Sequence, residues 1–108
     1  MKNNAVRRFI VAQMDCNALQ EIERGKKESH WMWFVFPQLD FLGQSFNSKY
    51  YGIHSKKEAA DFWSCRKLRL YYIKCCKALL SLPNPLLLSS TDYKKLRSSL
   101  TLFYYFAN

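Results

Sequence analysis

Residues that break regular structure are scarce in this sequence, which has three glycines and three prolines among 108 residues. Collagen-like chains and low-complexity disordered segments need many more of both, so these two classes are excluded. No apolar stretch approaches the roughly 18 residues of a membrane span, and the N-terminal segment MKNNAVRRF lacks the apolar run of a secretory signal. We therefore expect a globular protein of the cytoplasm that does not span a membrane.

Acidic residues are also few, since 8 Asp and Glu stand against 17 Lys and Arg and give a net charge of +9 at pH 7. Such an excess favours an anionic partner, for example nucleic acid, a nucleotide-like ligand or an acidic membrane surface. The alternative is a basic surface that meets only solvent. The positive charge is concentrated in residues 66–77, which contain five Lys or Arg residues and no acidic residue.

Residues typical of zinc sites are limited to two histidines and to four cysteines, Cys16, Cys65, Cys75 and Cys76. No C-x-x-C motif occurs, and the adjacent pair Cys75 and Cys76 would point in different directions from a helix. Without a secretory signal, the cysteines are expected to be reduced thiols. The phosphate-binding, dinucleotide-binding and H-E-x-x-H motifs are absent as well. We therefore expect no metal site and no cofactor.

The spacing of apolar residues predicts a fold made only of helices. Residues 4–14 and the segment around Ala18 to Ile22 both show helical spacing. Asp15 is expected to cap the second helix, and Gly25 fits the left-handed residue that ends it.

A long helix is predicted from Lys56 to Leu82, with a break near Cys65. Ser55 and Glu58 form a capping box at its start, because each side chain can bind a backbone N–H that the first helical turn leaves unpaired. Asp92 is expected to cap a last helix. The apolar face of that last helix is predicted to consist of Tyr93, Leu96, Leu100, Phe103 and Phe106.

The least ordinary segment is HWMWFVFPQ, residues 30–38. Its six consecutive large apolar residues cannot be buried on one side only, so we expect burial all round. One interpretation is a pocket wall, in which Trp31 or Trp33 stacks on a flat ligand and His30 and Gln38 supply polar ends. The alternative is a core segment whose polar ends make only local hydrogen bonds.

Arg97, Ser98 and Thr101 lie within one turn of the predicted last helix. An arginine beside hydroxyl groups can hold a phosphate or a carboxylate. In the alternative, the hydroxyls bond to helix carbonyls and the stem of Arg97 covers apolar surface.

His30 is the candidate catalytic residue, because an imidazole can exchange protons near neutral pH. Cys16 would supply a nucleophile only if the fold placed it beside His30. No carboxylate stands at an obvious spacing to orient His30.

The long basic helix carries interleaved aromatic residues, at Phe62, Trp63, Tyr71 and Tyr72. This pattern is compatible with binding to a nucleic-acid backbone. A charged outer face above an aromatic core face gives the same pattern, and we favour that interpretation.

Two segments, ALQEIERGKKESHWMWFVFPQL and KLRSSLTLF, resemble a small bacterial family of unknown function, numbered eighteen-ten and often labelled calpastatin-like. The resemblance implies a compact, cytoplasmic, all-helical domain and no established activity. It favours a pocket made from the tryptophan-rich segment and the last helix. The polar positions that match the family are Gln13, Lys27, Ser29, His30, Gln38, Ser45, Tyr51, Lys95, Arg97, Ser98, Ser99 and Thr101.

The same resemblance implies one more helix after Thr101-Leu102-Phe103 than this sequence contains. We therefore expect residues 1–108 to form a single, compact, multihelical all-α domain that lacks the last helix of the family. Its final helix would keep apolar side chains in water, which favours self-association.

Our main functional hypothesis is a pocket that binds, or also hydrolyses, a small anionic, nucleotide-like ligand. We expect His30, Gln38 and Arg97 to converge in it. The alternatives are a basic nucleic-acid-binding module and a degenerate structural or interaction protein without an active site. The expected ligand contacts are Lys27, His30, Trp31, Trp33, Gln38, Tyr51, Arg97, Ser98 and Thr101.

Overall fold

The computed structural model describes residues 6–39, 45–82 and 88–106. In these ranges the chain forms helices and no strand, apart from one isolated bridge between Leu39 and Ile53. The prediction of an all-helical fold is confirmed. The helices are α2 (Arg7–Gln13), α3 (Ala18–Glu23), α4 (Met32–Val35), α5 (Phe46–Tyr50), α6 (Lys56–Ser64), α7 (Arg66–Leu80) and α8 (Ser90–Phe106).

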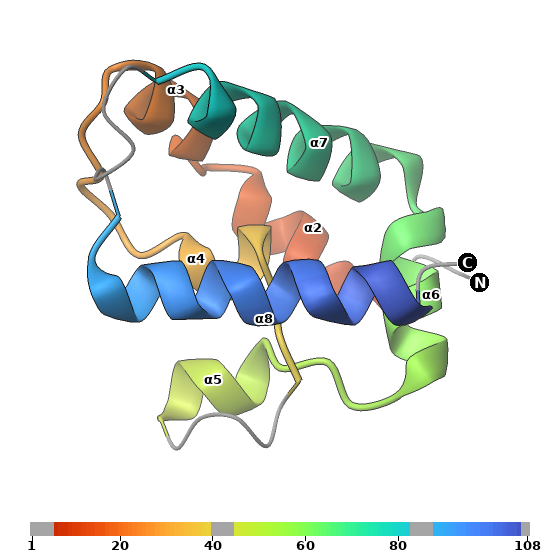
Figure 1. Ribbon diagram of the computed structural model, residues 1–108. Helices are drawn as coiled ribbons and strands as arrows, with labels where there is room; N and C mark the ends of the chain where they lie inside the picture. Colours follow the sequence, from red (N-terminus) through yellow and green to blue (C-terminus); the bar gives the residue numbers. More distant parts are fainter. Residues whose placement is uncertain (1–5, 40–44, 83–87, 107–108) are drawn as a thin grey trace.

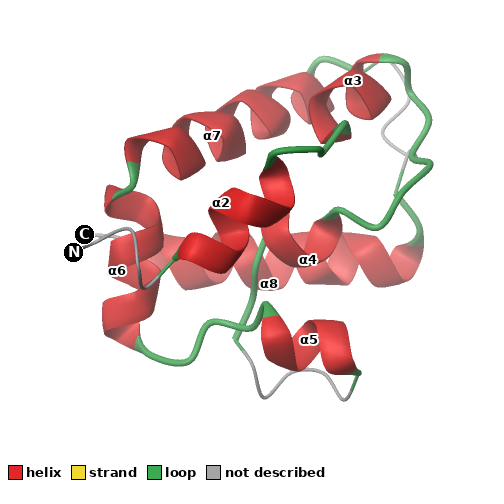
Figure 2. Cartoon of the chain, turned by 180° about the vertical axis from the view of Figure 1, so that it is seen from behind, coloured by secondary structure: helices red, strands yellow, loops and turns green. Residues whose placement is uncertain are grey.

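The two longest helices, α7 and α8, lie on opposite sides of the short helices α2 and α4 (Figure 1). Seen from behind, α2 and α4 again lie between them (Figure 2). Helix α4 packs against α2, α7 and α8, and α6 packs against both α7 and α8. No helix in the described ranges is long and apolar enough to cross a membrane.

Aromatic rings from several helices meet in the core. Phe62 contacts Phe9 and Phe103, with ring centroids 5.1 and 5.0 Å apart. Tyr72 contacts Phe36 edge-on at 5.0 Å. Such pairs contribute about 0.5–1.5 kcal/mol each beyond the burial of their area. The core of this small domain is therefore largely aromatic and joins α2, α6, α7 and α8.

The tryptophan-rich segment forms a single helical turn, α4. Trp31, Met32 and Phe36 are at most 2% exposed, as expected for a core segment. Trp33 and Phe34 are half-buried, so the prediction of burial all round was wrong for these two. A single turn points its side chains in every direction, and on one side α4 approaches the surface.

The capping box at the start of α6 is confirmed in its main bond, since Ser55 Oγ accepts the Glu58 N–H at 3.1 Å. The reciprocal bond differs, because Glu58 accepts the N–H of His54. The predicted break is confirmed at Cys65, whose extended backbone separates α6 from α7.

Glu58 also receives a two-pronged ion pair from Arg8 of α2, with N···O distances of 2.8 and 3.1 Å. The same guanidinium donates to the carbonyls of Tyr50 and Gly52. Side chains of Arg8 and Glu58 are about 15% exposed. This clamp joins α2, the end of α5 and the start of α6.

The other expected helix ends are confirmed only in part. Gly25 has a φ of 73° and follows the end of α3 as predicted. Helix α3 begins after Asn17, whose side chain makes no capping hydrogen bond, and Asp15 does not cap it either, so the prediction for Asp15 was wrong. The first N–H, from Ala18, is instead accepted by Cys16 Sγ at 3.3 Å. Residues 4 and 5 of the predicted first helix lie outside the described ranges.

The buried face of α8 differs from the predicted face. Leu102 and Phe103 are buried, whereas Tyr93 and Leu100 are 50% and 44% exposed. Ser99 is fully buried because its hydroxyl bonds to Tyr72, so a polar residue joins the core face. The cap is also different, since Ser89 Oγ accepts the N–H of Asp92 and the helix begins at Ser90.

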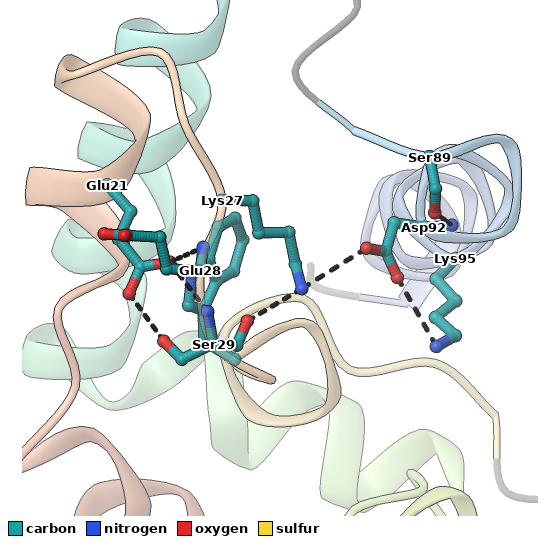
Figure 3. A network of polar contacts seen from close by, with 8 residues as sticks. Glu21, Lys27, Glu28, Ser29, Ser89, Asp92 and Lys95 are labelled. Carbon is teal, nitrogen blue, oxygen red and sulfur yellow. Dashed lines mark hydrogen bonds and ion pairs between the residues drawn. The ribbon is translucent and has the colours of Figure 1, made fainter.

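The carboxylate of Glu21 in α3 is 3% exposed and accepts four hydrogen bonds (Figure 3). The donors are the N–H of Glu28, the N–H and the hydroxyl of Ser29, and the indole N–H of Trp31, at 2.5–3.0 Å. Burial by itself raises the pKa of this carboxyl. The hydrogen bonds outweigh that effect and lower the pKa to about 2. Glu21 therefore stays ionised and anchors the loop that leads into α4.

We predict that Ser55→Ala destabilises the protein by about 1 kcal/mol, because the first turn of α6 loses its capping acceptor. Urea unfolding measures the change. Ser64→Ala is the matched control, since Ser64 is exposed at the other end of α6. Equal stabilities of the two variants would contradict the role of the cap.

We predict that acid removes a stabilising contribution of Glu21. Its pKa lies below the ordinary value of 4.5 in the folded state, so this contribution is full above that pH and disappears as the pH falls towards about 2. A shift of this size corresponds to about 3 kcal/mol. Glu21→Gln should therefore unfold more easily at neutral pH and depend less on pH between roughly 5 and 2.

The matched control is Glu28→Gln, which keeps the backbone bond to Glu21 and changes only a side chain in an exposed ion pair with Arg24. It should change the free energy of unfolding by less than about 1 kcal/mol. Urea unfolding over a pH series compares the two variants. If Glu21→Gln keeps the acid sensitivity of the parent protein, the assignment to Glu21 is wrong.

Candidate functional site

Three of the expected ligand contacts meet beside α4. Trp33, Gln38 and Tyr51 surround a small space together with Lys95. The Nζ of Lys95 lies 3.8 Å from the centre of the Trp33 ring, a cation–π contact. The space leaves no room for a water molecule, so this cluster is a packed seam and not a ligand pocket.

The side chains of Lys27 and Trp31 make contacts within the protein. Lys27 Nζ donates to the Ser29 carbonyl at 2.7 Å and pairs with Asp92 at 3.3 Å (Figure 3). Its ammonium also lies 5.3 Å from the Trp31 ring, which is 1% exposed. The expectation that Trp31 stacks on a ligand was therefore wrong, because α4 buries the indole and Glu21 holds it there.

Asp92 links this loop to the last helix. It pairs with Lys27 and, one helical turn away, with Lys95 at 3.5 Å. All three side chains are 15–19% exposed. Pairs this shielded from solvent are less screened by salt than surface pairs. These ion pairs therefore help to hold the start of α8 on the loop before α4.

His30 lies in a different hollow, of about 250 Å³, between the end of α2 and the start of α4. Cys16 and Asp15 line the same hollow. Burial raises the pKa of the Cys16 thiol, an effect that its bonds with Ala18 and Tyr71 only partly offset. The thiol is therefore protonated at neutral pH, which argues against a Cys16–His30 nucleophile. Within the described ranges, no group of three or more acidic, Cys or His side chains could hold a metal ion.

A hollow of about 560 Å³ lies along α8. Arg97, Ser98 and Thr101 line it, as the sequence led us to expect of one site. The remaining lining residues are Leu39, Lys94, Leu102, Tyr105 and Phe106. None of the described residues that line this hollow is acidic, and we call it the α8 groove.

Polar groups in the α8 groove differ in their availability. Thr101 donates its hydroxyl to the carbonyl of Arg97 at 2.9 Å, which is the helix back-bond of the alternative interpretation. In the described part of the chain, the side chains of Arg97 and Ser98 have no hydrogen-bond partner. Their donors are free to meet a ligand.

The predicted convergence of His30, Gln38 and Arg97 was wrong. Each lines a different hollow: His30 lies beside α2, Gln38 in the packed seam and Arg97 on α8. The sequence places the first two at the ends of one short segment, and α4 lies between them.

Several matched polar positions have structural roles. Gln13 donates to the Phe34 carbonyl at 2.9 Å. Ser45 caps α5 by accepting the N–H of Ser48. Together with Ser29 and Ser99, they support the fold rather than a ligand. The sequence reasoning missed Lys94 and Tyr105 as groove residues, although their spacing from Ser98 and Thr101 places all four on one helical face.

The aromatic residues of the basic helices are directed inward. Phe62 and Tyr72 are buried, and Trp63 and Tyr71 are half-buried. The outer face of α7 therefore offers positive charge without an exposed ring on which a base could stack.

Comparison with known proteins gives a family but no activity. The sequence model of the family described as "Protein of unknown function (DUF1810)" matches residues 3–108. The crystal structure of the conserved hypothetical protein Rv1873 from Mycobacterium tuberculosis is similar, with 34% sequence identity and a TM-score of 0.87. The match covers 93% of this chain and 75% of that one. Among curated proteins, none matches. Because the family model matches nearly its whole length, this chain belongs to the DUF1810 family of proteins of unknown function.

Proposed function

We propose that this protein binds a small anionic ligand that carries a flat ring, and that the α8 groove is the binding site. The observation that carries the proposal is that two cations, Lys94 and Arg97, line the groove together with the hydroxyl of Ser98. A volume of about 560 Å³ lies within the range of roughly 300–1,000 Å³ typical of small-molecule pockets.

The chemistry of the groove separates into two parts. Arg97 and Ser98 provide donors for a phosphate or carboxylate, and Lys94 adds charge one helical turn away. Leu102 and Phe106 provide an apolar floor, while the ring of Tyr105 is 67% exposed and free to stack. A nucleotide or nucleotide sugar presents both features, a flat base and a phosphate.

Binding rather than hydrolysis is the function that this groove supports. Among the described residues that line it, none is a histidine or a carboxylate that could activate water, and His30 lies in another hollow. We also propose that the protein acts in the cytoplasm, where its four free thiols stay reduced.

We predict that Arg97→Gln weakens ligand binding by about tenfold or more, because a charge-assisted hydrogen bond contributes about 1.5–3 kcal/mol. A thermal-shift screen against nucleotides and nucleotide sugars first identifies a ligand, and calorimetry then compares the variants. The matched control is Arg66→Gln, since Arg66 is exposed on α7, away from the groove. If no compound raises the melting temperature, or if both variants bind alike, the groove is not the site.

Two copies of the chain could also meet through the C-terminal end of α8, and we propose that they do so weakly. Tyr104 and Tyr105 are 74% and 67% exposed there, beside Leu100 at 44%. Lys94 and Arg97 of two copies would repel each other, so salt should strengthen the association.

Sedimentation over a concentration series tests this association. We expect the average mass to rise with protein concentration and with salt, and to fall back in Tyr105→Ser. Tyr93→Ser is the matched control, because Tyr93 is 50% exposed near the other end of α8. If the protein is a monomer at every concentration, the proposed self-association is wrong, and the proposal of ligand binding is not affected.

A further inference from the structure

A second unassigned surface runs along the outer side of α7. Every third or fourth residue of this helix is exposed along one stripe, which continues into the turn after it. The stripe consists of Lys67, Leu70, Lys74, Lys77 and Ser81.

This stripe borders two shallow hollows that share Lys74. One, of about 290 Å³, is lined also by Gln13, Lys67, Leu70 and Tyr71. The other has a volume of about 400 Å³ and lies between α7 and α3. Its lining residues are Leu19, Glu23, Lys74, Lys77, Ala78 and Ser81. Because they meet at Lys74, we treat the two as one continuous surface and call it the α7 furrow.

The floor of the α7 furrow is apolar and held in place. Tyr71, Leu19 and Ala78 contribute to it. The hydroxyl of Tyr71 accepts the N–H of Leu19 at 3.1 Å and contacts Cys16, so it links α7 to the start of α3. Leu70 stands at the edge and is 42% exposed. An occupant would therefore meet a fixed apolar floor flanked by lysines.

The charge of the α7 furrow is one-sided. Helix α7 contains no acidic residue, and Glu23 of α3 is the one carboxylate among the lining residues of the two hollows. Lys67 lines only the hollow without Glu23, whereas Lys74 and Lys77 line the hollow that contains it. The favoured occupant is thus acidic at one end and neutral or basic at the other.

We propose that the α7 furrow binds an acidic amphipathic helix of a partner protein. Lys67 and Lys74 are seven residues apart on α7, or about 10.5 Å along its axis. Carboxylates seven residues apart on a second helix have the same spacing, so they would meet both lysines when that helix lies along α7. An apolar residue between those carboxylates would cover Leu70.

The apolar part of the α7 furrow is the reason for choosing a peptide over a nucleic acid. A phosphate backbone needs the lysines but gains nothing from Leu70 or from the floor beneath it. Exposed aromatic rings, which bind unpaired bases, do not line the stripe.

A synthetic peptide serves as the probe. It is a fluorescein-labelled helix of about 18 residues, rich in Ala and Gln, with two Glu residues seven positions apart and a Leu between them. A second peptide has the same composition in scrambled order. Fluorescence anisotropy at about 0.15 M salt measures both affinities, so that long-range attraction is screened.

We expect the ordered peptide to bind at least about fivefold more tightly than the scrambled one, because only its Glu and Leu residues share a face. Lys67→Glu combined with Lys74→Glu should weaken binding by about tenfold or more. Leu70→Ser should weaken it by about threefold, through lost apolar contact. The control, Lys49→Glu with Lys56→Glu, makes the same change in net charge on α5 and α6 and should cost less than about twofold.

Circular dichroism checks that each variant is folded. Equal binding of the two peptides, or equal losses in the two charge-reversed variants, would show non-specific attraction and overturn the proposal. A labelled DNA duplex provides the remaining comparison. If the duplex binds more tightly than the ordered peptide, and if the variant with Lys67→Glu and Lys74→Glu no longer binds it, the α7 furrow is a nucleic-acid site and the proposal fails.

Discussion

The carboxylate of Glu21 is almost completely removed from water, and it accepts four hydrogen bonds from the loop that leads into α4. A buried carboxylate is tolerated only when such donors replace its hydration. One donor is the indole of Trp31, so the ionised side chain also determines where the most hydrophobic segment of the chain enters the core. Helix α4 has a single turn and little stability of its own. Its position between α2, α7 and α8 therefore depends on this anchor and on packing.

Ion pairs connect the loop held by Glu21 to the last helix. Lys27 follows α3, and its ammonium reaches both the loop and Asp92 of α8. Asp92 in turn holds Lys95 above Trp33. These contacts direct the first turns of α8 towards α4, while Phe103 packs in the aromatic core at the other end. Polar residues are thus part of the inner face of α8, which explains why its apolar residues alone misidentified that face.

Cations outside these contacts line two separate surfaces of the molecule. Lys94 and Arg97 line the α8 groove, and Lys67, Lys74 and Lys77 line the α7 furrow. The first has a volume of about 560 Å³, within the range of small-molecule pockets, whereas the second consists of two smaller hollows along one helix. A basic composition alone does not distinguish one anionic partner from another. The shape of each surface and the apolar side chains beside the charges make that distinction.

Local features were determined by the sequence by itself. The helical class, the cap at Ser55, the break at Cys65 and the left-handed Gly25 all follow from residues within about one or two turns of each other. The three residues Arg97, Ser98 and Thr101 share a helix flank for the same reason.

The tertiary structure determined which residues that are distant in sequence come together and which do not. It separated His30 from Arg97, buried Trp31 and paired Lys27 with Asp92 across most of the chain. Such pairings depend on how whole helices pack, which no local pattern contains. For that reason only the packing showed which of the polar residues that the sequence singles out hold the fold, and which have side chains without a bond in the described part of the chain.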